Sequence, residues 1–163
     1  MIIVSNTSPV VNLYVIGQLE ILKIFQTELI IPEAVYNEIV ISGHGKPGSK
    51  ELDDINWIKT RKVKDRNLVK ALSKELDKGE AESIALAVES KADLLLLDEK
   101  IGRKVASRFS LNYVGLLGVI IMGKHKGIID KVEPLLEKLI VEAGFWIDPD
   151  LYNYVLTKAG EVK

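Results

Sequence analysis

Acidic residues recur where an apolar run has just ended or where a helical segment is about to begin. They are Glu38, Glu80, Glu82, Asp98 and Glu99. Carboxylates that share a cleft raise one another's pKa and resist joint ionisation unless a cation neutralises them. Mg²⁺ prefers oxygen ligands, and one or two such ions can activate water and stabilise the leaving oxygen of a phosphodiester. If the fold gathers these acids, they indicate metal-dependent phosphodiester hydrolysis.

A parallel sheet would gather them, and the apolar pattern predicts one. Short runs of Ile, Val and Leu alternate with longer segments of helical period, as in a mostly parallel sheet covered on both faces. The expected strands are residues 2–4, 29–31, 57–63, 94–97 and 111–114. The third contains four polar residues among its seven, which places it at a sheet edge. Ligand sites of such sheets lie beyond the carboxyl ends of the strands.

Helices are expected to leave directly from the first two strands. Thr7 or Ser8 can cap one helix, with Pro9 in its first turn, and Pro32 stands where a helix over residues 33–40 should begin. Further helices are expected at residues 19–25, 65–76, 79–90, 100–109, 116–124, 128–143 and 150–158. The stretch SGHGKPGS, residues 42–49 with His44, predicts a flexible loop.

Neither a repeat nor a long linker divides the chain, so we expect one domain over residues 1–163. The helices of about residues 128–158 should pack on this domain or at a dimer interface. A domain of 163 residues can bury a sizeable core.

Composition excludes several kinds of chemistry. The chain has no Cys, which removes disulfides, thiolate zinc sites and cysteine nucleophiles. With 22 basic and 23 acidic residues the net charge is −1, so nucleic-acid binding must depend on a local basic patch.

The N-terminus lacks a basic n-region, and polar residues 5–8 interrupt its apolar run. It is expected to be neither a signal peptide nor a membrane span, which predicts a cytoplasmic protein.

Five segments occur in a fixed order between the N-terminus and about Ile129. They are IIVSNTSPVVNL, IIPEAVYNEI, LDKGEAESIALA, ADLLLLDEKIGRKVA and NYVGLLGVIIMGKHKGII. In this order they resemble the PIN domains, specifically a VapC-like branch of archaeal and bacterial toxin-type ribonucleases. Each motif alone is weak, but five in order are a specific signal. The resemblance implies a three-layer α/β/α sandwich around a mostly parallel sheet of about five strands.

The resemblance also implies an activity and its partners. It implies an endoribonuclease that depends on Mg²⁺ or Mn²⁺, with a quartet of acids around the metal, and that is commonly the toxin of a toxin–antitoxin pair. The substrate would be RNA, the protein partner an antitoxin, and the oligomeric state a homodimer with no membrane association.

The resemblance assigns site residues by position. Glu38 would be the second acid, Glu80 the third and Asp98 the fourth. Glu82 is a less favoured alternative to Glu80, because the helix motif can be aligned either way. Residues that would support the site are Thr7 or Ser8 in the first motif and Glu99, which could help to bind metal.

Asn6 departs from the family pattern, which usually has Asp as the first acid. An amide oxygen can coordinate a hard cation but brings no negative charge, so metal affinity and activation of water should both fall. The alternative function is therefore a catalytically weakened PIN-like protein that acts as an RNA-binding or protein-binding module. Apart from the resemblance, Asn6 could simply be a helix-capping or turn residue.

Ordinary structural roles compete with the other assignments as well. Glu80 and Glu82 suit the N-terminal end of a helix through the helix dipole alone. Asp98 could be a turn aspartate, and Glu38 could lie on a solvated face.

Basic residues follow Asp98 at spacings of three to four residues: Lys100, Arg103, Lys104 and Arg108. Most of them fall along one helix face, which could bind RNA phosphates or could simply be solvated. Arg103 is the preferred phosphate ligand because the matched segment contains it, followed by Lys100 and Lys104. The two Trp and five Tyr do not interleave with basic residues along the chain, so most are expected to be core or interface anchors.

Overall fold

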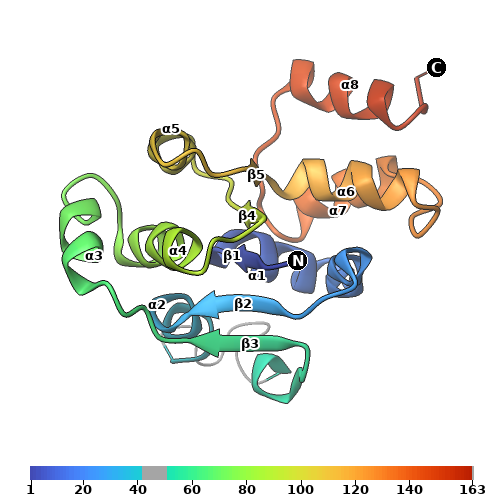
Figure 1. The fold of residues 1–163 in the computed structure, drawn as a ribbon. Helices are drawn as coiled ribbons and strands as arrows, with labels where there is room; N and C mark the ends of the chain where they lie inside the picture. The colour runs from blue at the N-terminus through green and yellow to red at the C-terminus, as the bar shows by residue number, and fades with distance from the viewer. Residues whose placement is uncertain (42–50, 163) are drawn as a thin grey trace.

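Five short strands form one parallel sheet at the centre of the chain. The computed structural model describes residues 1–41 and 51–162, and the expected loop over residues 42–49, with His44, lies outside them. The strands are β1 (Ile3–Ser5), β2 (Leu29–Pro32), β3 (Ile58–Arg61), β4 (Leu94–Leu96) and β5 (Tyr113–Val114). Their order across the sheet is β3-β2-β1-β4-β5, and every neighbouring pair is parallel (Figure 1). The prediction of a mostly parallel sheet is confirmed.

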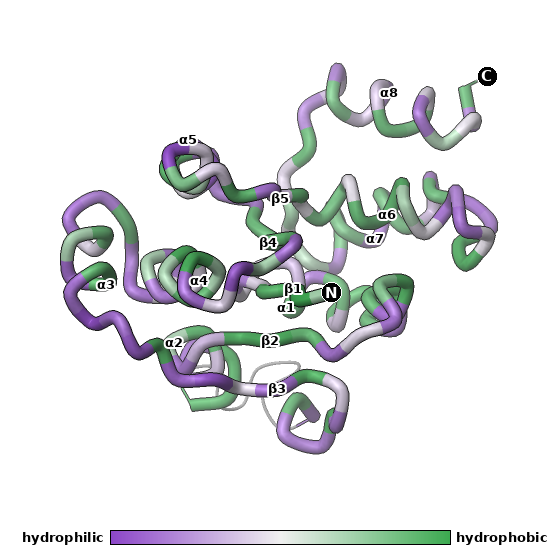
Figure 2. Tube along the Cα trace, in the orientation of Figure 1, coloured by the Kyte–Doolittle hydropathy of each residue, from purple (hydrophilic) through white to green (hydrophobic). Residues whose placement is uncertain are grey.

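Strand β3 lies at one edge of the sheet, as its polar composition predicts. Lys59, Thr60 and Arg61 are exposed, whereas all of β2 is buried. Figure 2 shows this contrast as hydrophilic colours along much of β3 and hydrophobic colours along β2. The strand is shorter than the expected span of residues 57–63.

Alternate residues of the strands point to opposite faces of the sheet. Ile3 and Leu96 belong to the apolar cluster on one face, and Val4 and Leu95 belong to the cluster on the other. Helical segments that add buried residues to the first cluster include α1 (Thr7–Val15), η1 (Leu19–Phe25), α6 (Leu116–His125), α7 (Glu133–Val141) and α8 (Pro149–Lys158). The second cluster is covered by α3 (Arg66–Leu72), α4 (Lys78–Glu89) and α5 (Lys100–Arg108). The chain thus forms three layers, with α8 packed outermost on α6 (Figure 1).

The helix expected over residues 33–40 divides into two parts. α2 (Glu33–Tyr36) is a single α-helical turn, and the chain continues as the π-helical segment η2 (Asn37–Ile41), which carries Glu38. Single π-helical turns are frequent at functional sites. A short 3₁₀ helix that the sequence analysis did not predict, η3 (Glu51–Asp54), precedes β3.

Other helix predictions also need correction. Asn6 occupies the N-cap of α1, so Thr7 and Ser8 lie inside the helix instead of capping it. α7 begins only at Glu133, where the backbone N–H groups of Val132 and Glu133 donate to the carboxylate of Glu161 and Pro134 stands in the first turn. The η1 segment has the expected bounds but is a 3₁₀ helix. Within the two described ranges, no helix has both the length and the apolar character needed to cross a membrane.

Candidate active site

The carboxyl ends of the strands bring together Asn6, Glu38 and Asp98, with Glu80 beside them. Asn6 immediately follows β1, Glu38 lies on η2 after β2, and Asp98 stands two residues beyond β4. Because β1 pairs with β2 on one side and with β4 on the other, Asn6 lies between the two acids. Glu80 is in the first turn of α4, which packs on all three strands. Four segments that are distant in the sequence thus meet at the carboxyl ends of the central strands.

The first turn of α1 holds the acids on both sides of Asn6. Thr7 Oγ1 donates a hydrogen bond to Glu38 Oε2 at 2.5 Å. Ser8 Oγ donates to Asp98 Oδ2 at 3.1 Å, and Asn12 Nδ2 donates to Ser8 Oγ at 2.9 Å. The hydroxyl groups that were expected to cap this helix therefore orient two of the candidate metal ligands.

Asp98 is also fixed by the start of α6. The backbone N–H of Leu116 donates to Asp98 Oδ1 at 2.8 Å. Gly115 allows this approach, because a Cβ atom at that position would lie 2.7 Å from Asp98 Oδ1 and would overlap the guanidinium of Arg103. The glycine thus permits the close packing of the Asp98 and Arg103 side-chain ends around the N-terminus of α6.

Glu38 rests against the backbone at the start of α4. A Cβ atom at Gly79 would overlap Glu38 Oε1 and would lie 3.2 Å from Oε2. Any larger residue at position 79 would therefore force the Glu38 carboxylate to move. This contact brings the second and third acids of the predicted quartet to the same turn.

Glu80 is the acid that is most perturbed by its surroundings. Burial raises its pKa, and so do the hydrogen bond to Asp77 and the negative charges of Asp77, Glu99 and Glu38, so that the pKa reaches about 8. Desolvation and nearby like charges both disfavour the ionised carboxyl group. Burial and the adjacent Asp77 are the larger causes of this raised pKa, and the charges of Glu99 and Glu38 add to it.

Asn6 occupies the centre of the group and is only 6% exposed. It is the N-cap residue of α1, but its side chain makes no capping hydrogen bond. Its Oδ1 instead lies 3.4 Å from Ser83 Oγ, a long contact, since the single hydroxyl proton of Ser83 is donated mainly to the carbonyl of Gly79 at 2.7 Å. The amide oxygen therefore faces α4, and the capping interpretation accounts for the backbone of Asn6 but not for its side chain.

Glu82 has structural partners on two other elements, α3 and α2. Its side chain is 3% exposed and forms an ion pair with Arg66 at 3.1 Å. Its other oxygen accepts a hydrogen bond from the backbone N–H of Ala34 at 2.9 Å, in the first turn of α2. Both carboxylate oxygens are thus engaged within the chain. Of the two acids that the alignment left open, Glu80 is the one beside Glu38.

The basic residues of α5 have distinct environments. Lys100 and Lys104 are exposed, whereas Arg103 is half-buried and donates from Nε to the carbonyl of Leu97 at 2.9 Å. Arg108 is paired with Glu75 at 2.8 Å. Arg103 is therefore the basic residue that the structure holds next to Asp98.

The oxygen donors of this site are of the kind that bind a divalent cation. The donors of Asn6, Glu38, Glu80 and Asp98 are all oxygen atoms, which suits Mg²⁺ or Mn²⁺. A cation would also relieve the charge crowding that raises the pKa of Glu80. Among residues 1–41 and 51–162, however, no three His, Cys, Asp or Glu side chains converge closely enough to form a ready-made metal cluster. The donor chemistry thus fits a hard cation, with the neutral Asn6 at the centre of the set.

Asp77 was missed by the sequence analysis. Its Oδ1 caps α4 by accepting from the backbone N–H of Glu80 at 2.8 Å, and its charge helps to raise the pKa of Glu80. An Asp three residues before a Glu at a helix start is a capping-box pattern, so this residue could have been found from sequence. The role of Gly115 depends on tertiary contacts and had no comparable local signal.

Replacing Glu80 with Gln should stabilise the metal-free protein near neutral pH. A raised folded-state pKa means that the Glu80 contribution to stability is greatest below its ordinary pKa of 4.5 and declines as pH rises toward about 8. At pH 8 in chelator we expect a gain of about 1 kcal/mol, after allowance for solvent screening at this half-buried group. This corresponds to a rise of about 2–4 °C in Tm.

Thermal unfolding of Glu80→Gln at pH 5 and pH 8 checks this expectation. The exposed Glu142→Gln provides a matched control that should not change Tm. A Glu80→Gln variant that is no more stable than the wild type at pH 8 would contradict the electrostatic account.

Comparison with known proteins agrees with the fold. A family model described as a PIN domain matches residues 2–161, which is nearly the whole chain. Among curated proteins, none matches the chain significantly. PIN domains are generally nucleases and typically use divalent metals, as the oxygen donors at the strand ends would suit. The chain therefore belongs to the PIN-domain family.

Proposed function

We propose that this protein is an endoribonuclease that depends on Mg²⁺ or Mn²⁺. Asn6, Glu38, Glu80 and Asp98 would hold the metal, with Glu99 as a supporting ligand. The observation that carries the proposal is the pair of hydrogen bonds from the first turn of α1, in which Thr7 orients Glu38 and Ser8 orients Asp98 on either side of Asn6.

The side chains around this site have separate tasks in the proposed reaction. Thr7 and Ser8 restrict the rotamers of Glu38 and Asp98, and the N–H of Leu116 fixes the second oxygen of Asp98. When bound, a divalent ion would polarise a water molecule and stabilise charge on the leaving oxygen of the phosphodiester. Arg103, held beside Asp98 by the carbonyl of Leu97, is suited to bind a phosphate of the substrate. Exposed Lys100 and Lys104 would attract the RNA backbone.

Replacing Asp98 with Asn should reduce both metal binding and RNA cleavage. The substitution keeps the shape of the side chain but removes one negative charge from the set of ligands. We expect Mn²⁺ affinity and cleavage rate to fall by at least about 10- to 100-fold, since even the outer partners of metal ligands have effects of that size. Isothermal titration with Mn²⁺ and cleavage of a fluorescent single-stranded RNA provide the measurements.

Asp130→Asn is a suitable control, because Asp130 is exposed on the segment before α7. It should retain wild-type metal binding and activity. If the folded wild-type protein neither binds Mn²⁺ nor cleaves RNA, the proposed activity is refuted.

Asn6 supports a second candidate function. A neutral amide at the centre of the site lowers the charge that is available to hold a cation. A PIN domain weakened in this way could keep its fold and act as an RNA-binding or protein-binding module. The activity of an Asn6→Asp variant separates this function from the main proposal.

Asn6→Asp should increase metal-dependent cleavage if residue 6 is a metal ligand. An added charge next to the cation should raise Mn²⁺ affinity by about 10-fold or more. Without metal, a further carboxylate at this buried position should lower Tm, and Mn²⁺ should restore it. Equal cleavage by variant and wild type, with no change in Mn²⁺ affinity, would show that residue 6 does not bind the metal.

We extend the main proposal to a role as a VapC-like toxin that forms a cytoplasmic homodimer and is restrained by an antitoxin protein. The five motif segments that resemble this branch support the extension. Expression of the wild-type protein should then arrest growth of a bacterial host, whereas Asp98→Asn should not. Normal growth with an active, well-expressed wild-type enzyme would argue for a nuclease outside toxin–antitoxin systems.

A further inference from the structure

Glu82 is a buried carboxylate that the proposed metal site does not use. It lies on α4 two residues after Glu80, and its side chain is 3% exposed. Its Oε2 accepts from the guanidinium of Arg66 at 3.1 Å, and its Oε1 accepts from the backbone N–H of Ala34 at 2.9 Å. Burying a carboxylate costs free energy, and one ion pair often fails to offset that cost. Stability alone is therefore a poor explanation for this residue.

The start of α2 depends on Glu82 for a cap. The N-cap residue of α2 is Pro32, whose ring carries no hydrogen-bonding group, and no side chain of the flanking residues caps the helix. The first N–H groups of a helix have no partner within it, and a helix of one turn is marginal by itself. Glu82 supplies an acceptor for one of these groups, the N–H of Ala34, from a distant helix. Its carboxylate thus holds the beginning of α2 against α4.

The far end of the same segment also rests on α4. α2 continues directly into η2, so Glu38 lies four residues beyond Ala34. The Glu38 carboxylate lies against Gly79, where a Cβ atom would overlap its Oε1. Gly79 and Glu82 are three residues apart, about one turn of α4, and Glu80 is between them in the sequence. The segment is therefore attached to α4 at two points, the backbone of Ala34 and the side chain of Glu38.

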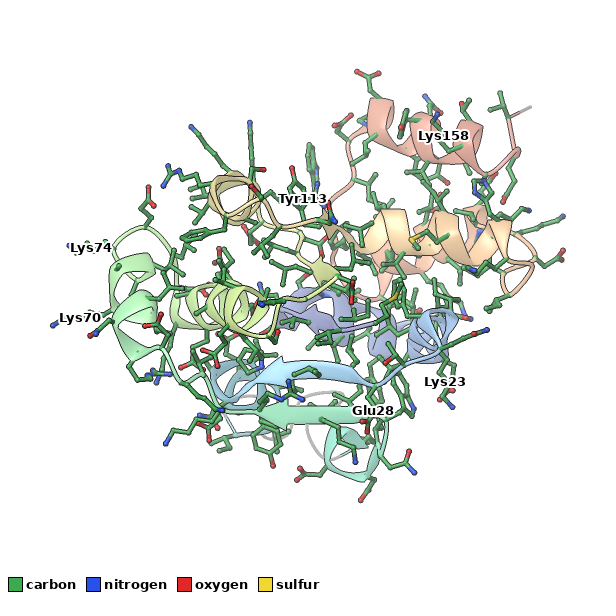
Figure 3. All side chains as sticks on the ribbon, viewed as in Figure 1. Lys23, Glu28, Lys70, Lys74, Tyr113 and Lys158 are labelled. Atoms are coloured by element: carbon green, nitrogen blue, oxygen red, sulfur yellow. The ribbon has the colours of Figure 1, made fainter. Side chains whose placement is uncertain are left out.

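Arg66 balances the buried charge of Glu82. It is the first residue of α3, and its side chain is 50% exposed. Figure 3 shows Lys70 and Lys74, which follow it, pointing away from α4 into solvent. Arg66 is instead turned toward α4. With Arg66 on one oxygen and Ala34 on the other, both carboxylate oxygens of Glu82 are engaged by donors of the protein.

We propose that Glu82 is a positioning residue for the metal site, which places Glu38 near Glu80 by holding the start of α2. It does not touch the cation itself. The inference rests on the proposed metal site, and it gives a separate role to the acid that the alignment left as an alternative to Glu80. Partners that orient metal ligands typically change metal affinity by about 10- to 100-fold when they are lost.

Two substitutions separate the reach of Glu82 from its charge. Glu82→Gln removes the charge but keeps an oxygen for the N–H of Ala34, and the half-exposed Arg66 can turn into solvent. Glu82→Asp keeps the charge but withdraws the acceptor by one methylene group. In isothermal titration of the full chain with Mn²⁺, Glu82→Gln should bind nearly as the wild type does, whereas Glu82→Asp should lose about 10- to 100-fold in affinity.

The opposite pattern would overturn the proposal. Loss of Mn²⁺ affinity in Glu82→Gln with wild-type affinity in Glu82→Asp would show that the metal responds to the charge of Glu82. Wild-type affinity in both variants would show that Glu82 does not position the site, and it would leave the proposed metal site intact.

Glu89 offers a matched control on the same helix. It lies seven residues after Glu82, on the same face of α4 and at the opposite end from Glu80. Its carboxylate also accepts from backbone groups, the N–H groups of Lys64 and Asp65 before α3. Glu89→Asp should therefore lower Tm without changing Mn²⁺ affinity. An equal loss of affinity in Glu89→Asp and Glu82→Asp would reduce the effect of Glu82 to general destabilisation.

A double-mutant cycle tests whether Glu82 acts through Glu38. If it does, Glu82→Asp should lower Mn²⁺ affinity in the wild type but should cause little further loss in a Glu38→Ala background. Titrations are made well below the Tm of every variant, so that each protein is folded. Additive losses would overturn the proposal, because Glu82 would then affect the metal by a route that does not include Glu38.

Hydrogen exchange of the metal-free protein makes the test independent of the proposed activity. In chelator, Glu82→Asp should speed exchange of the backbone amides of residues 33–41, whereas Glu89→Asp should leave them unchanged. Unchanged exchange in Glu82→Asp would overturn the proposal. Faster exchange there, combined with a wild-type protein that binds no Mn²⁺, would support the placement of Glu38 by Glu82 and refute the metal site.

Discussion

The site depends on one constraint, the negative charge gathered at the carboxyl ends of the central strands. Carboxylates from η2, from the first turn of α4 and from the end of β4 repel one another and lose hydration as the helices close over them. Hydrogen-bond donors from Thr7, Ser8 and the N-terminus of α6 offset part of this cost at Glu38 and Asp98. At Glu80 the remaining cost is visible as a raised pKa. The neutral amide of Asn6 adds no further repulsion at the centre of the site, which favours folding without metal. It also adds no negative charge to attract a cation.

Much of the fold could be predicted from the sequence, because its elements have strong local signals. β1, β2 and β4 are short apolar runs, and their parallel pairing follows from the helical segments between them. The π-helical turn at Asn37–Ile41 had no such signal, since backbone geometry and contacts with distant segments determine it.

In the site, too, some residues have a local signal in the sequence and others depend on contacts with distant segments. Glu38, Glu80 and Asp98 could be selected because they follow strands or open a helix, and the structure brings Glu38 and Glu80 together at Gly79. The structural partners of Glu82 could not be predicted, because Arg66 and Ala34 lie on other elements.

The two outer strands determine how this molecule can meet another copy of itself. At one edge β3 exposes Lys59 and Arg61, and at the other β5 is only two residues long. Charged or very short edge strands oppose the addition of a foreign strand. Continuation of the sheet from one molecule into the next is therefore disfavoured, and self-association has to use helical surfaces. The protein can thus hold an all-parallel sheet at its centre without offering a template for fibrous aggregation.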